Sequence, residues 1–450
     1  MALIAPFRGL TYNYSKLKDP EKLITPPYDV ISEKEQEEYY NAHPNNIIRL
    51  ELGKKQDGDS DLENRYTRAA GFLKKWEAED VLCRSKKDTI YLTSHSYDPG
   101  DGKGERVRWG FVCLVKIEEE GSGVILPHEK TFSAHKDDRL KLLKACSTQL
   151  SQVFGLYDDS GEGILDRMRT ITASPPEISF AFKDGTYHKL WRITDTEIIK
   201  KVAGSMKGKS IFIADGHHRY ETSRNYRNLM REAHGKGAER PYEYVMMYLT
   251  DMGEDGLTVL PSHRLIKKKT DFDPAGFLEK ARQWFDIKKM VLSETDVNNL
   301  AIEIQSALAA KGAENPAFIF HCNKDTAYYM ISLKAGIMDE MEKDLHPSLR
   351  NLDVIVLSRL VLQKALGFTK VDLDNDGIFQ YNSNIATAIT MVDSGECEIV
   401  FLLNPTRIEQ VQEIARESLI MPRKSTYFYP KVMTGMVLNK IDPDDSIQIF

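Results

Sequence analysis

The chain contains 450 residues, of which 41% are hydrophobic and 28% are charged, and its formal net charge is −6 at pH 7. A chain of this length holds two or three domains with a large core, and its composition is that of a soluble globular protein. The net negative charge argues against a general nucleic-acid binder.

Cysteine usage and hydropathy indicate the cellular compartment of the protein. The five cysteines are scattered and form no CxxC pair, which favours reduced thiols over a disulfide framework. The first residues lack the apolar core of a signal peptide, and no apolar run approaches membrane-spanning length. We therefore expect a cytoplasmic protein with no membrane partner, and we leave the oligomeric state open.

The N-terminal segment combines prolines with aromatic residues. Pro26-Pro-Tyr-Asp-Val-Ile-Ser32 should be extended, because proline disfavours helix in the residue before it. Ser32 and Glu35 form the pattern of a capping box, which predicts a helix over residues 33–40. Asp29, within the extended segment, is a candidate contact to a substrate or a phosphate.

Residues 46–52 alternate in polarity, which predicts a strand that carries Arg49 and Glu51 on one face. Two interpretations stay open for this pair of charges. They form an ion pair on the surface, or they lie on a strand that lines a cleft. On the second interpretation both side chains are candidate contacts to a ligand.

An amphipathic helix is predicted over residues 62–79, and strands over residues 89–97 and 106–117. The loop 98–104 between the two strands is rich in glycine. It lacks the order GxxxxGK[ST] and has no helix behind it. We therefore interpret it as a hairpin turn rather than a phosphate loop.

A polar patch follows the next predicted strand. It consists of His128, Glu129 and Lys130. The pair His128-Glu129 resembles the start of the zinc motif HExxH, but Phe132 stands where the second histidine would be, so we assign no metal. Glu129 is our candidate general base, with His128 or Lys130 to hold its position or to polarise a substrate. Arg139, near the start of the following helix, is a candidate phosphate contact. The alternative is a charged strand end at the surface.

The densest group of reactive side chains lies in residues 210–223. The apolar run 211–214 predicts a buried strand, Asp215-Gly216 predicts a turn, and residues 217–233 predict a helix. This order directs free backbone N–H groups and the positive end of the helix dipole to one point, which suits an anion such as phosphate. We therefore predict a phosphate site formed by Asp215, Gly216, His217, His218 and Arg219.

Beyond this helix the pattern indicates a second α+β unit. The acidic run 371–377 imitates the start of an EF-hand loop, but Ser383 stands at its twelfth position, so we interpret the run as a turn. We expect two domains, residues 1–268 with the candidate site and residues 269–450. The predicted elements are strands at 244–250, 257–266, 317–321, 327–333 and 398–403 and helices at 273–284, 294–311 and 408–416.

The last polar patch, residues 421–431, interleaves cations and hydroxyl groups with aromatic side chains. Such a segment either contacts a phosphate or a base, or closes the core with amphipathic aromatic residues. Its candidate ligand contacts are Lys424, Ser425, Thr426 and Lys431.

Taken together, five of these blocks resemble one prokaryotic family, the domain-of-unknown-function family 1015. The most specific block is Ala214-Asp-Gly-His-His-Arg-Tyr-Glu221. The family name implies no reaction. The other blocks are residues 26–32, 46–53, 126–131 and 421–431.

A shorter resemblance does imply a chemistry. Asp215-Gly-His-His-Arg219 is similar to the phosphate-binding signature of the ParB/sulfiredoxin superfamily, in which a strand, a glycine turn and an arginine-bearing helix hold nucleotide phosphates. The resemblance implies an α+β fold with mixed sheets and a ParB/sulfiredoxin-like nucleotide-binding core. It also implies that Gly216 allows close approach of the backbone, that His217, His218 and Arg219 contact phosphate oxygens, and that Asp215 contacts a metal or orients a histidine. Sulfiredoxin carries a cysteine in this motif where this chain has histidines, which argues against sulfinic acid reduction.

Our leading hypothesis is therefore a small-molecule phosphotransferase. ADP or ATP would bind at residues 215–219, Glu129 would activate a hydroxyl substrate, and Lys130 or Arg139 would neutralise charge. The kinase branch of the resemblance implies free serine or another hydroxylated metabolite as the substrate, with Mg²⁺ as a further candidate cofactor. The same chemistry in reverse would dephosphorylate such a metabolite, for example phosphoserine.

Two alternatives belong to other classes of protein. The first is a nucleotide-binding switch or a DNA-associated, ParB-like protein, against which the acidic balance and the lack of a long Lys/Arg run count. The second is a metal-dependent hydrolase with Asp215, His217 and His218 as ligands. Adjacent residues on a helix point about 100° apart, so two neighbouring histidines rarely reach one metal.

Overall fold

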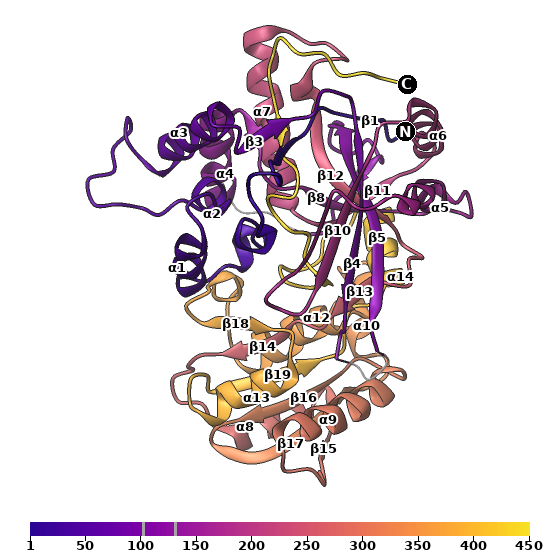
Figure 1. Cartoon of the computed structure of the whole chain (residues 1–450). Helices are drawn as coiled ribbons and strands as arrows, with labels where there is room; N and C mark the ends of the chain where they lie inside the picture. The colour runs from indigo at the N-terminus through magenta and orange to yellow at the C-terminus, as the bar shows by residue number, and fades with distance from the viewer. Residues whose placement is uncertain (101–103, 130–132) are drawn as a thin grey trace. The chain divides into compact units, whose positions relative to one another are not determined.

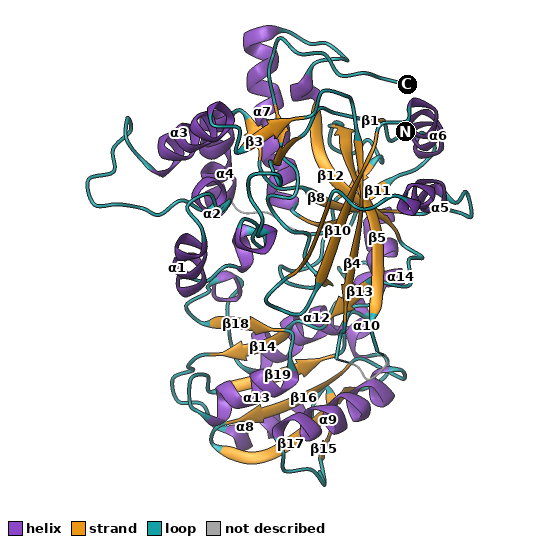
Figure 2. Ribbon diagram, viewed as in Figure 1, coloured by secondary structure: helices purple, strands orange, loops and turns teal. Residues whose placement is uncertain are grey.

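The computed structural model describes residues 1–100, 104–129 and 133–450 and divides into two compact units (Figure 1). The first unit contains residues 1–127, 131–258 and 430–450, and the second contains residues 128–130 and 259–429. Each unit combines helices with sheets, which confirms the α+β class (Figure 2). The sequence predicted one boundary between residues 268 and 269. In the structure, however, the chain returns to the first unit at residue 430.

A large mixed sheet forms the centre of the first unit, in the order β6-β11-β8-β12-β5-β4-β10-β9, with β1 paired to β5. The pairs β6–β11 and β8–β12 are parallel, and the other pairs are antiparallel. The chain therefore leaves β6 and β11 at the same edge of the sheet. The strands are β1 (Ile4–Ala5), β4 (Ile90–Tyr97), β5 (Arg106–Lys116), β6 (Ile125–Leu126), β8 (Val153–Tyr157), β9 (Ile178–Ala181), β10 (Tyr187–Ile193), β11 (Ile211–Asp215) and β12 (Tyr244–Asp251).

Helices and two short strand pairs surround this sheet. The pairs are β2 (Leu10–Tyr12) with β3 (Leu82–Arg84), and β7 (Thr148–Gln149) with β21 (Asn439–Lys440), so the C-terminal segment is hydrogen-bonded into the first unit. The predicted capping box of Ser32 and Glu35 is confirmed at the start of α1. The helices are α1 (Glu33–Ala42), α2 (Ile48–Glu51), α3 (Arg65–Ala78), α4 (Ser133–Cys146), α5 (Ile164–Arg169), α6 (Thr196–Met206) and α7 (His217–His234).

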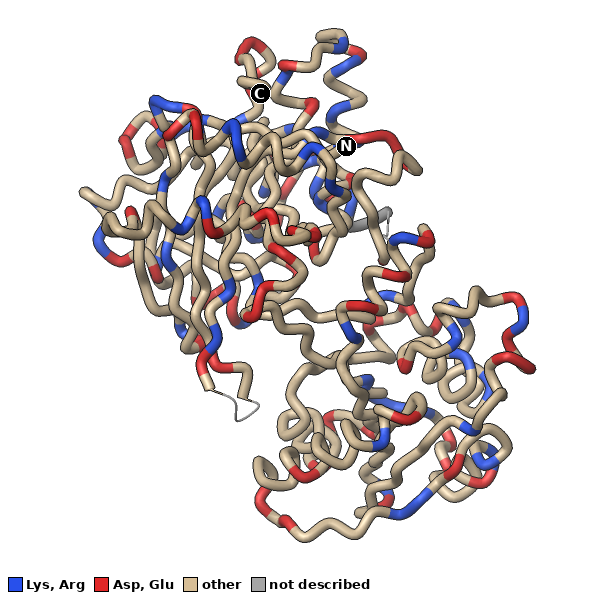
Figure 3. Tube along the Cα trace, turned by 90° about the vertical axis from the view of Figure 1, so that its right-hand side faces the viewer, with Lys and Arg blue, Asp and Glu red and all other residues tan. Residues whose placement is uncertain are grey.

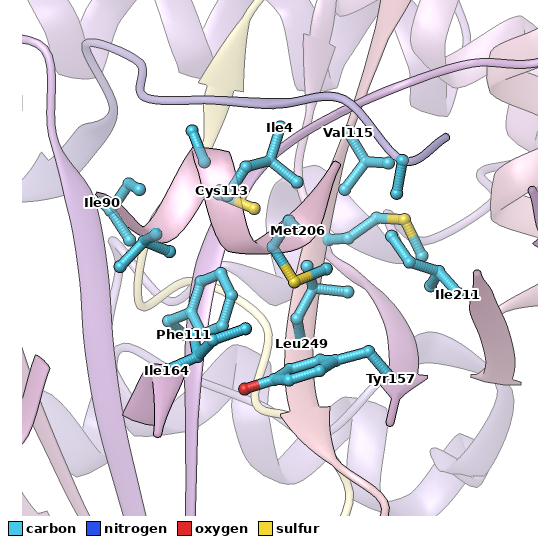
Figure 4. Close-up of a cluster of buried hydrophobic side chains, with 14 of the residues drawn as sticks. Ile4, Ile90, Phe111, Cys113, Val115, Tyr157, Ile164, Met206, Ile211 and Leu249 are labelled. Atoms are coloured by element: carbon cyan, nitrogen blue, oxygen red, sulfur yellow. The ribbon is translucent and has the colours of Figure 1, made fainter. Parts of the chain in front are cut away.

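The core of the first unit lies between the sheet and helices α5 and α6. Side chains from the sheet, such as Phe111 and Leu249, meet Ile164 of α5 and Met206 of α6 in one apolar cluster (Figure 4). These positions recur at alternate residues of the strands and along one face of the helices, as burial on one side requires.

The predicted strand over residues 46–52 is wrong, because this segment contains the short helix α2. Asn46 fixes the helical turn: its Oδ1 accepts a hydrogen bond from the Ile48 backbone at 2.9 Å, and its Nδ2 donates to the Lys22 carbonyl at 2.7 Å. Asparagine commonly starts a turn in this way. The alternating polarity that predicted a strand reflects a single buried helical turn instead.

The sheet of the first unit also contains a buried polar chain. His188 Nδ1 lies 2.8 Å from His95 Nδ1, and His188 Nε2 lies 2.6 Å from the Thr186 hydroxyl, which donates to Asp184. Since the one hydroxyl proton of Thr186 points to Asp184, His188 carries its proton on Nε2 and His95 carries its proton on Nδ1. Burial lowers the pKa of both imidazoles, that of His188 to about 4.

The second unit contains a separate sheet in the order β15-β17-β16-β19-β14-β18 and a short pair of β13 with β20. Helices α9 and α13 pack their apolar sides on one face of this sheet (Figure 1). The strand predicted over 257–266 is divided into two, because Pro261 has no N–H for a sheet ladder. The strands are β13 (Thr258–Leu260), β14 (His263–Ile266), β15 (Phe285–Lys289), β16 (Ala317–Cys322), β17 (Asp325–Leu333), β18 (Phe379–Asn382), β19 (Ile399–Leu403) and β20 (Tyr427–Tyr429). The helices are α8 (Pro274–Ala281), α9 (Val297–Gly312), α10 (Ile337–Met341), α11 (Pro347–Arg350), α12 (Asp353–Val356) with a π-helical continuation (Leu357–Ala365), α13 (Ile385–Asp393) and α14 (Ile408–Arg416).

Positive and negative side chains are interspersed along the trace (Figure 3). Within the described part of the chain, no helix is both long enough and apolar enough to cross a membrane.

Candidate functional site

The predicted strand, glycine turn and helix are confirmed in the first unit. Strand β11 ends at Asp215, and α7 begins at His217. The pairing of β11 with β8 shifts register between Ile213 and Asp215, a bulge that re-aims the side chains at the strand end. Gly216 between them has φ +91°, a conformation that glycine adopts far more easily than other residues.

Asp215 joins two cations of the predicted site. Its Oδ1 accepts a hydrogen bond from Lys431 Nζ at 2.6 Å, and its Oδ2 accepts one from Arg219 Nη2. Arg219 Nη1 also donates to the backbone carbonyl of Gln152 at the start of β8. The predicted ligand contact Lys431 therefore lies beside the predicted phosphate-binding turn, although the two are far apart in sequence.

Gly216 is also required by the packing of Arg219. A Cβ atom at Gly216 would lie 2.9 Å from Nε and 3.0 Å from Cζ of Arg219. Because Asp215 and Gln152 hold the guanidinium group in place, it could not move aside freely. The glycine therefore lets the guanidinium group lie directly against the start of α7.

His217 is buried and His218 is half-buried in the first turn of α7. Burial lowers the pKa of His217 to about 3, and the neighbouring charges of His218, Arg219 and Lys431 add to this effect, whereas Asp215 opposes it. His217 is thus a neutral imidazole near pH 7. It therefore adds no positive charge to this turn.

A pocket in the first unit extends behind Arg219, along the facing sides of α4 and α7. Its empty volume is about 380 Å³, part of it open to solvent. It brings together three of the predicted residues, Glu51, Arg139 and Arg219. The other lining residues are Leu142, Leu143, Thr148, Gln149, Leu150, Ser151, Thr222 and Ser223.

A network of charges forms the α4 side of this pocket. Arg139 Nη1 donates to the backbone carbonyl of Glu51 at 2.8 Å and lies 3.5 Å from Glu51 Oε1, which also accepts a hydrogen bond from Ser151 at 3.0 Å. Arg139 Nε and Nη2 donate to Asp138, and its guanidinium carbon lies 4.2 Å from the centre of the Tyr28 ring. Although burial alone lowers the pKa of Arg139, Glu51 and Asp138 raise it above the usual arginine value.

Tyr28 and Asp29 belong to the same electrostatic environment. Burial raises the pKa of Tyr28, and its hydroxyl also interacts with the charges of Asp29, Arg139 and Arg219. Arg49, by contrast, does not line the pocket. Its Nη2 donates to the Tyr40 carbonyl at 2.8 Å, and its guanidinium group packs on the Tyr40 ring.

In the second unit, the His128-Glu129 block and residues 421–426 lie together. Glu129 forms a parallel bridge with Met421, and its Oε1 accepts a hydrogen bond from the backbone N–H of Lys424. His128 Nε2 lies 3.3 Å from the Thr426 hydroxyl. Lys130, predicted as a partner of Glu129, lies outside the described residues.

Ser425 and Arg264 complete the polar surroundings of Glu129 in the second unit. Ser425 is buried, and its hydroxyl donates to the Pro422 carbonyl at 2.6 Å, so it has a structural role. Arg264 was missed by the sequence analysis. It packs on the Tyr381 ring at 4.7 Å; burial lowers its pKa, and Tyr381 and Glu129 oppose this shift.

Thr222 and Ser223, which line the pocket, were not predicted from the sequence either. They lie three and four residues after Arg219 on α7, so helical spacing places them on the same face as Arg219. This spacing is the signal that could have identified them. Ser151 and Gln152 lie in a short connection before β8 and carry no comparable signal.

The described residues contain no group of three or more His, Cys, Asp and Glu side chains that could hold a metal ion. The arrangement around Asp215 agrees with this, because each of its carboxylate oxygens accepts a hydrogen bond from a cationic side chain. As it stands, this turn is a cation-rich site with one carboxylate.

These observations define a class of protein. It is an α+β protein in which a buried arginine lies against a glycine at the start of a long helix. The chain belongs to the family described as Protein of unknown function (DUF1015), whose model matches residues 4–355. This confirms the family predicted from the sequence blocks; the matched range ends before the block 421–431. No curated protein matches the chain.

Solved structures similar to this chain include three with low sequence identity. Free serine kinase in complex with AMP has 11% identity and a TM-score of 0.34, covering 68% of this chain and 83% of that chain. SbnI with C-terminal truncation from Staphylococcus aureus has 10% identity and a TM-score of 0.35, covering 74% and 90%. A conserved hypothetical protein from Pyrococcus furiosus has 13% identity and a TM-score of 0.32, covering 68% and 86%.

Proposed function

We propose that this chain is a nucleotide-dependent phosphotransferase that acts on the hydroxyl group of a small metabolite. ADP or ATP is the proposed nucleotide. Its phosphates would bind at the start of α7, with Gly216, Arg219 and Lys431 as the main contacts and His217 and His218 beside them. The observation that carries this proposal is the arrangement of Arg219.

Arg219 is fixed in place and still has donors for a ligand. A guanidinium group has five N–H donors. Toward the described residues Arg219 uses two of them, one to Asp215 and one to Gln152, which leaves three. Lys431 and the positive end of the α7 dipole add further positive potential. This combination of groups fits a phosphate better than any neutral ligand.

Phosphoryl transfer depends on positioning and charge stabilisation more than on an elaborate nucleophile. In the proposed step the hydroxyl oxygen of the acceptor bonds to the terminal phosphorus, the bond from phosphorus to the bridging oxygen breaks, and the hydroxyl proton passes to a base. Glu129 remains the proposed base, with His128 and Lys130 as its partners.

Free serine is the proposed acceptor, on the resemblance of residues 215–219 to the free serine kinases. In reverse, the same step would move the phosphoryl group of phosphoserine to a nucleotide. Mg²⁺ is part of the proposal as a partner of the phosphates, because it usually binds through substrate phosphates and one or two carboxylates.

Calorimetric titration of the full chain with ADP, ATP and AMP, with and without Mg²⁺, tests the proposal. We expect Arg219→Lys to weaken nucleotide binding about 10- to 100-fold, or about 1.4 to 2.7 kcal/mol, because lysine keeps the charge but loses the planar fork. Arg227→Lys is the matched control. Arg227 is buried two turns further along α7 and donates to the Ile117 carbonyl and to Glu119.

The control should lower the melting temperature and leave the nucleotide affinity unchanged. Two results would contradict the proposal. One is a wild-type chain that binds none of the three nucleotides at millimolar concentration. The other is an equal loss of affinity in the Arg219 and Arg227 variants.

A further inference from the structure

The pocket behind Arg219 has walls that phosphate binding does not explain. Its empty volume of about 380 Å³ includes space that is open to solvent. One wall is apolar and consists of Leu142 and Leu143 of α4 together with Leu150. The pocket is also lined by the polar residues Glu51, Ser151 and Thr222. A ligand with one apolar face and a hydroxylated edge matches these walls.

The Glu51 end of the pocket offers hydrogen-bond acceptors and not donors. Arg139 makes hydrogen bonds through four of its five N–H groups, to Glu51 and Asp138, so little of it is available to an anion. Glu51 Oε1 accepts from Ser151 and Arg139, while no residue of the described chain donates to Oε2. This carboxylate can therefore accept a hydrogen bond from a ligand.

Thr222 supplies the second polar contact. Its side chain is buried, with 3% of its surface exposed, and its hydroxyl has no hydrogen-bond partner among the residues that the structure describes. A buried hydroxyl without a partner is unfavourable, so a ligand that bonds to it gains affinity. Thr222 lies one helical turn after Arg219, on the same face of α7.

We infer that this pocket binds the ribose of the nucleotide whose phosphates are held at Arg219. Glu51 accepts a hydrogen bond from one of the two ribose hydroxyl groups, and Thr222 bonds to the other. The leucine wall packs against the apolar face of the sugar ring. The inference rests on the proposed function and adds a specificity to it: the site selects ribonucleotides over deoxyribonucleotides, because a carboxylate is a strong acceptor that loses its partner when the hydroxyl is absent.

Calorimetric titration with ADP, 2′-deoxy-ADP and 3′-deoxy-ADP measures this specificity. We expect wild-type protein to bind ADP about tenfold more tightly than each deoxy analogue. Glu51→Gln should reduce one of these ratios to about two, and Thr222→Val should reduce the other to about two. Thr222→Ser, which keeps the hydroxyl, should retain both ratios. Inorganic pyrophosphate, which lacks a sugar, should bind equally well to all four proteins.

The outcomes separate this inference from the proposed function. If wild-type protein binds neither ADP nor pyrophosphate, the phosphate site fails and the inference fails with it. If ADP and both deoxy analogues bind equally, the phosphate site stands and only the ribose site is wrong. Glu51→Gln breaks a buried ion pair, so a variant that does not fold is foreseeable. In that case Thr222→Val decides the question, because it replaces an unpartnered hydroxyl with a methyl group of the same shape.

Discussion

Two buried arginines line the same pocket of the first unit, but their surroundings differ. Arg139, on α4, makes four hydrogen bonds to Glu51 and Asp138 and packs on Tyr28. Arg219, on α7, makes two, to Asp215 and the Gln152 carbonyl, and lies against a glycine. Their side chains are similarly buried, 6% and 9% exposed.

This difference shows why burial alone does not identify a binding arginine. The charge of a buried guanidinium group must be compensated, and the charges of Arg139 and Arg219 are both compensated. Arg139 is compensated so completely that few N–H groups remain. Arg219 is oriented by one carboxylate and one carbonyl and keeps most of its donors. The number of donors left after compensation therefore separates a structural arginine from a candidate ligand contact.

The largest effect that would test this comparison is the loss of stability in Arg139→Lys. Lysine keeps the charge but cannot bond to Glu51 and Asp138 together, so we expect a loss of about 3 kcal/mol in the free energy of unfolding. Nucleotide affinity should fall less than threefold in the folded variant. Thermal unfolding and titration of the same preparation check both expectations. An affinity loss as large as that of Arg219→Lys would remove the distinction between the two arginines.

A smaller effect is expected from the glycine against which Arg219 lies. Gly216→Ala places a Cβ atom in a conformation with φ +91° and within 3.0 Å of the Arg219 guanidinium carbon. We expect a cost of about 1–2 kcal/mol from the backbone, together with weaker nucleotide binding because Arg219 is displaced. Gly163→Ala at the start of α5 is the matched control, since Gly163 is also left-handed, with φ +67° and ψ +41°, and the nearest atom to an added Cβ is Asp166 Oδ2 at 3.7 Å.

Both alanine variants should lose similar stability, measured by thermal unfolding, and only Gly216→Ala should lose nucleotide affinity. If the two variants bind nucleotide equally well, Gly216 is needed only for the backbone conformation. The position of Arg219 would then have no connection with binding.

The sequence predicted the start of α7 well because its signals are local. An apolar run, a glycine and a helical pattern are adjacent in the chain, so they identified β11, Gly216 and the helix without any knowledge of the fold. Asn46 shows the limit of the same approach. Its side-chain bond to Lys22 is a tertiary contact, and it converts a segment with strand-like alternation into a helix.

The sequence identified several residues of the candidate site, but it did not show which of them lie together in the folded chain. Lys431 and Asp215 are separated by more than two hundred residues, and only the return of the C-terminal segment to the first unit brings them to 2.6 Å. Likewise, no sequence pattern indicates the strand bridge between Glu129 and Met421 in the second unit, or the hydrogen bond that the Lys424 backbone donates to Glu129. Helical spacing places Thr222 on the same face of α7 as Arg219, but that its hydroxyl has no partner among the described residues becomes evident only in the packed structure.

A further expected effect is a difference in acid sensitivity between the two sides of the pocket. On the α7 side, burial lowers the pKa of His217 to about 3, from a usual value near 6.5. Between these values the unfolded chain binds a proton that the folded chain does not, so this stability is fully present above about pH 6.5 and is lost as the pH falls. On the α4 side, burial tends to raise the pKa of Asp138, but Arg139, Tyr66 and Arg65 outweigh it and lower it below 3.8. Its stability is therefore lost only below about pH 3.8.

Thermal unfolding between pH 7 and pH 4.5 should therefore respond to His217 and not to Asp138. We expect the free energy of unfolding of His217→Asn to fall less steeply than that of wild-type protein, by about 1.4 kcal/mol per pH unit below pH 6. Asp138→Asn should be less stable at every pH in this range, with a slope equal to that of wild-type protein. The other buried histidines contribute equally to all three proteins, so the difference in slope isolates His217. Equal slopes for wild-type protein and His217→Asn would mean that this imidazole is protonated in the folded chain. The start of α7 would then carry one more positive charge than a neutral His217 gives it.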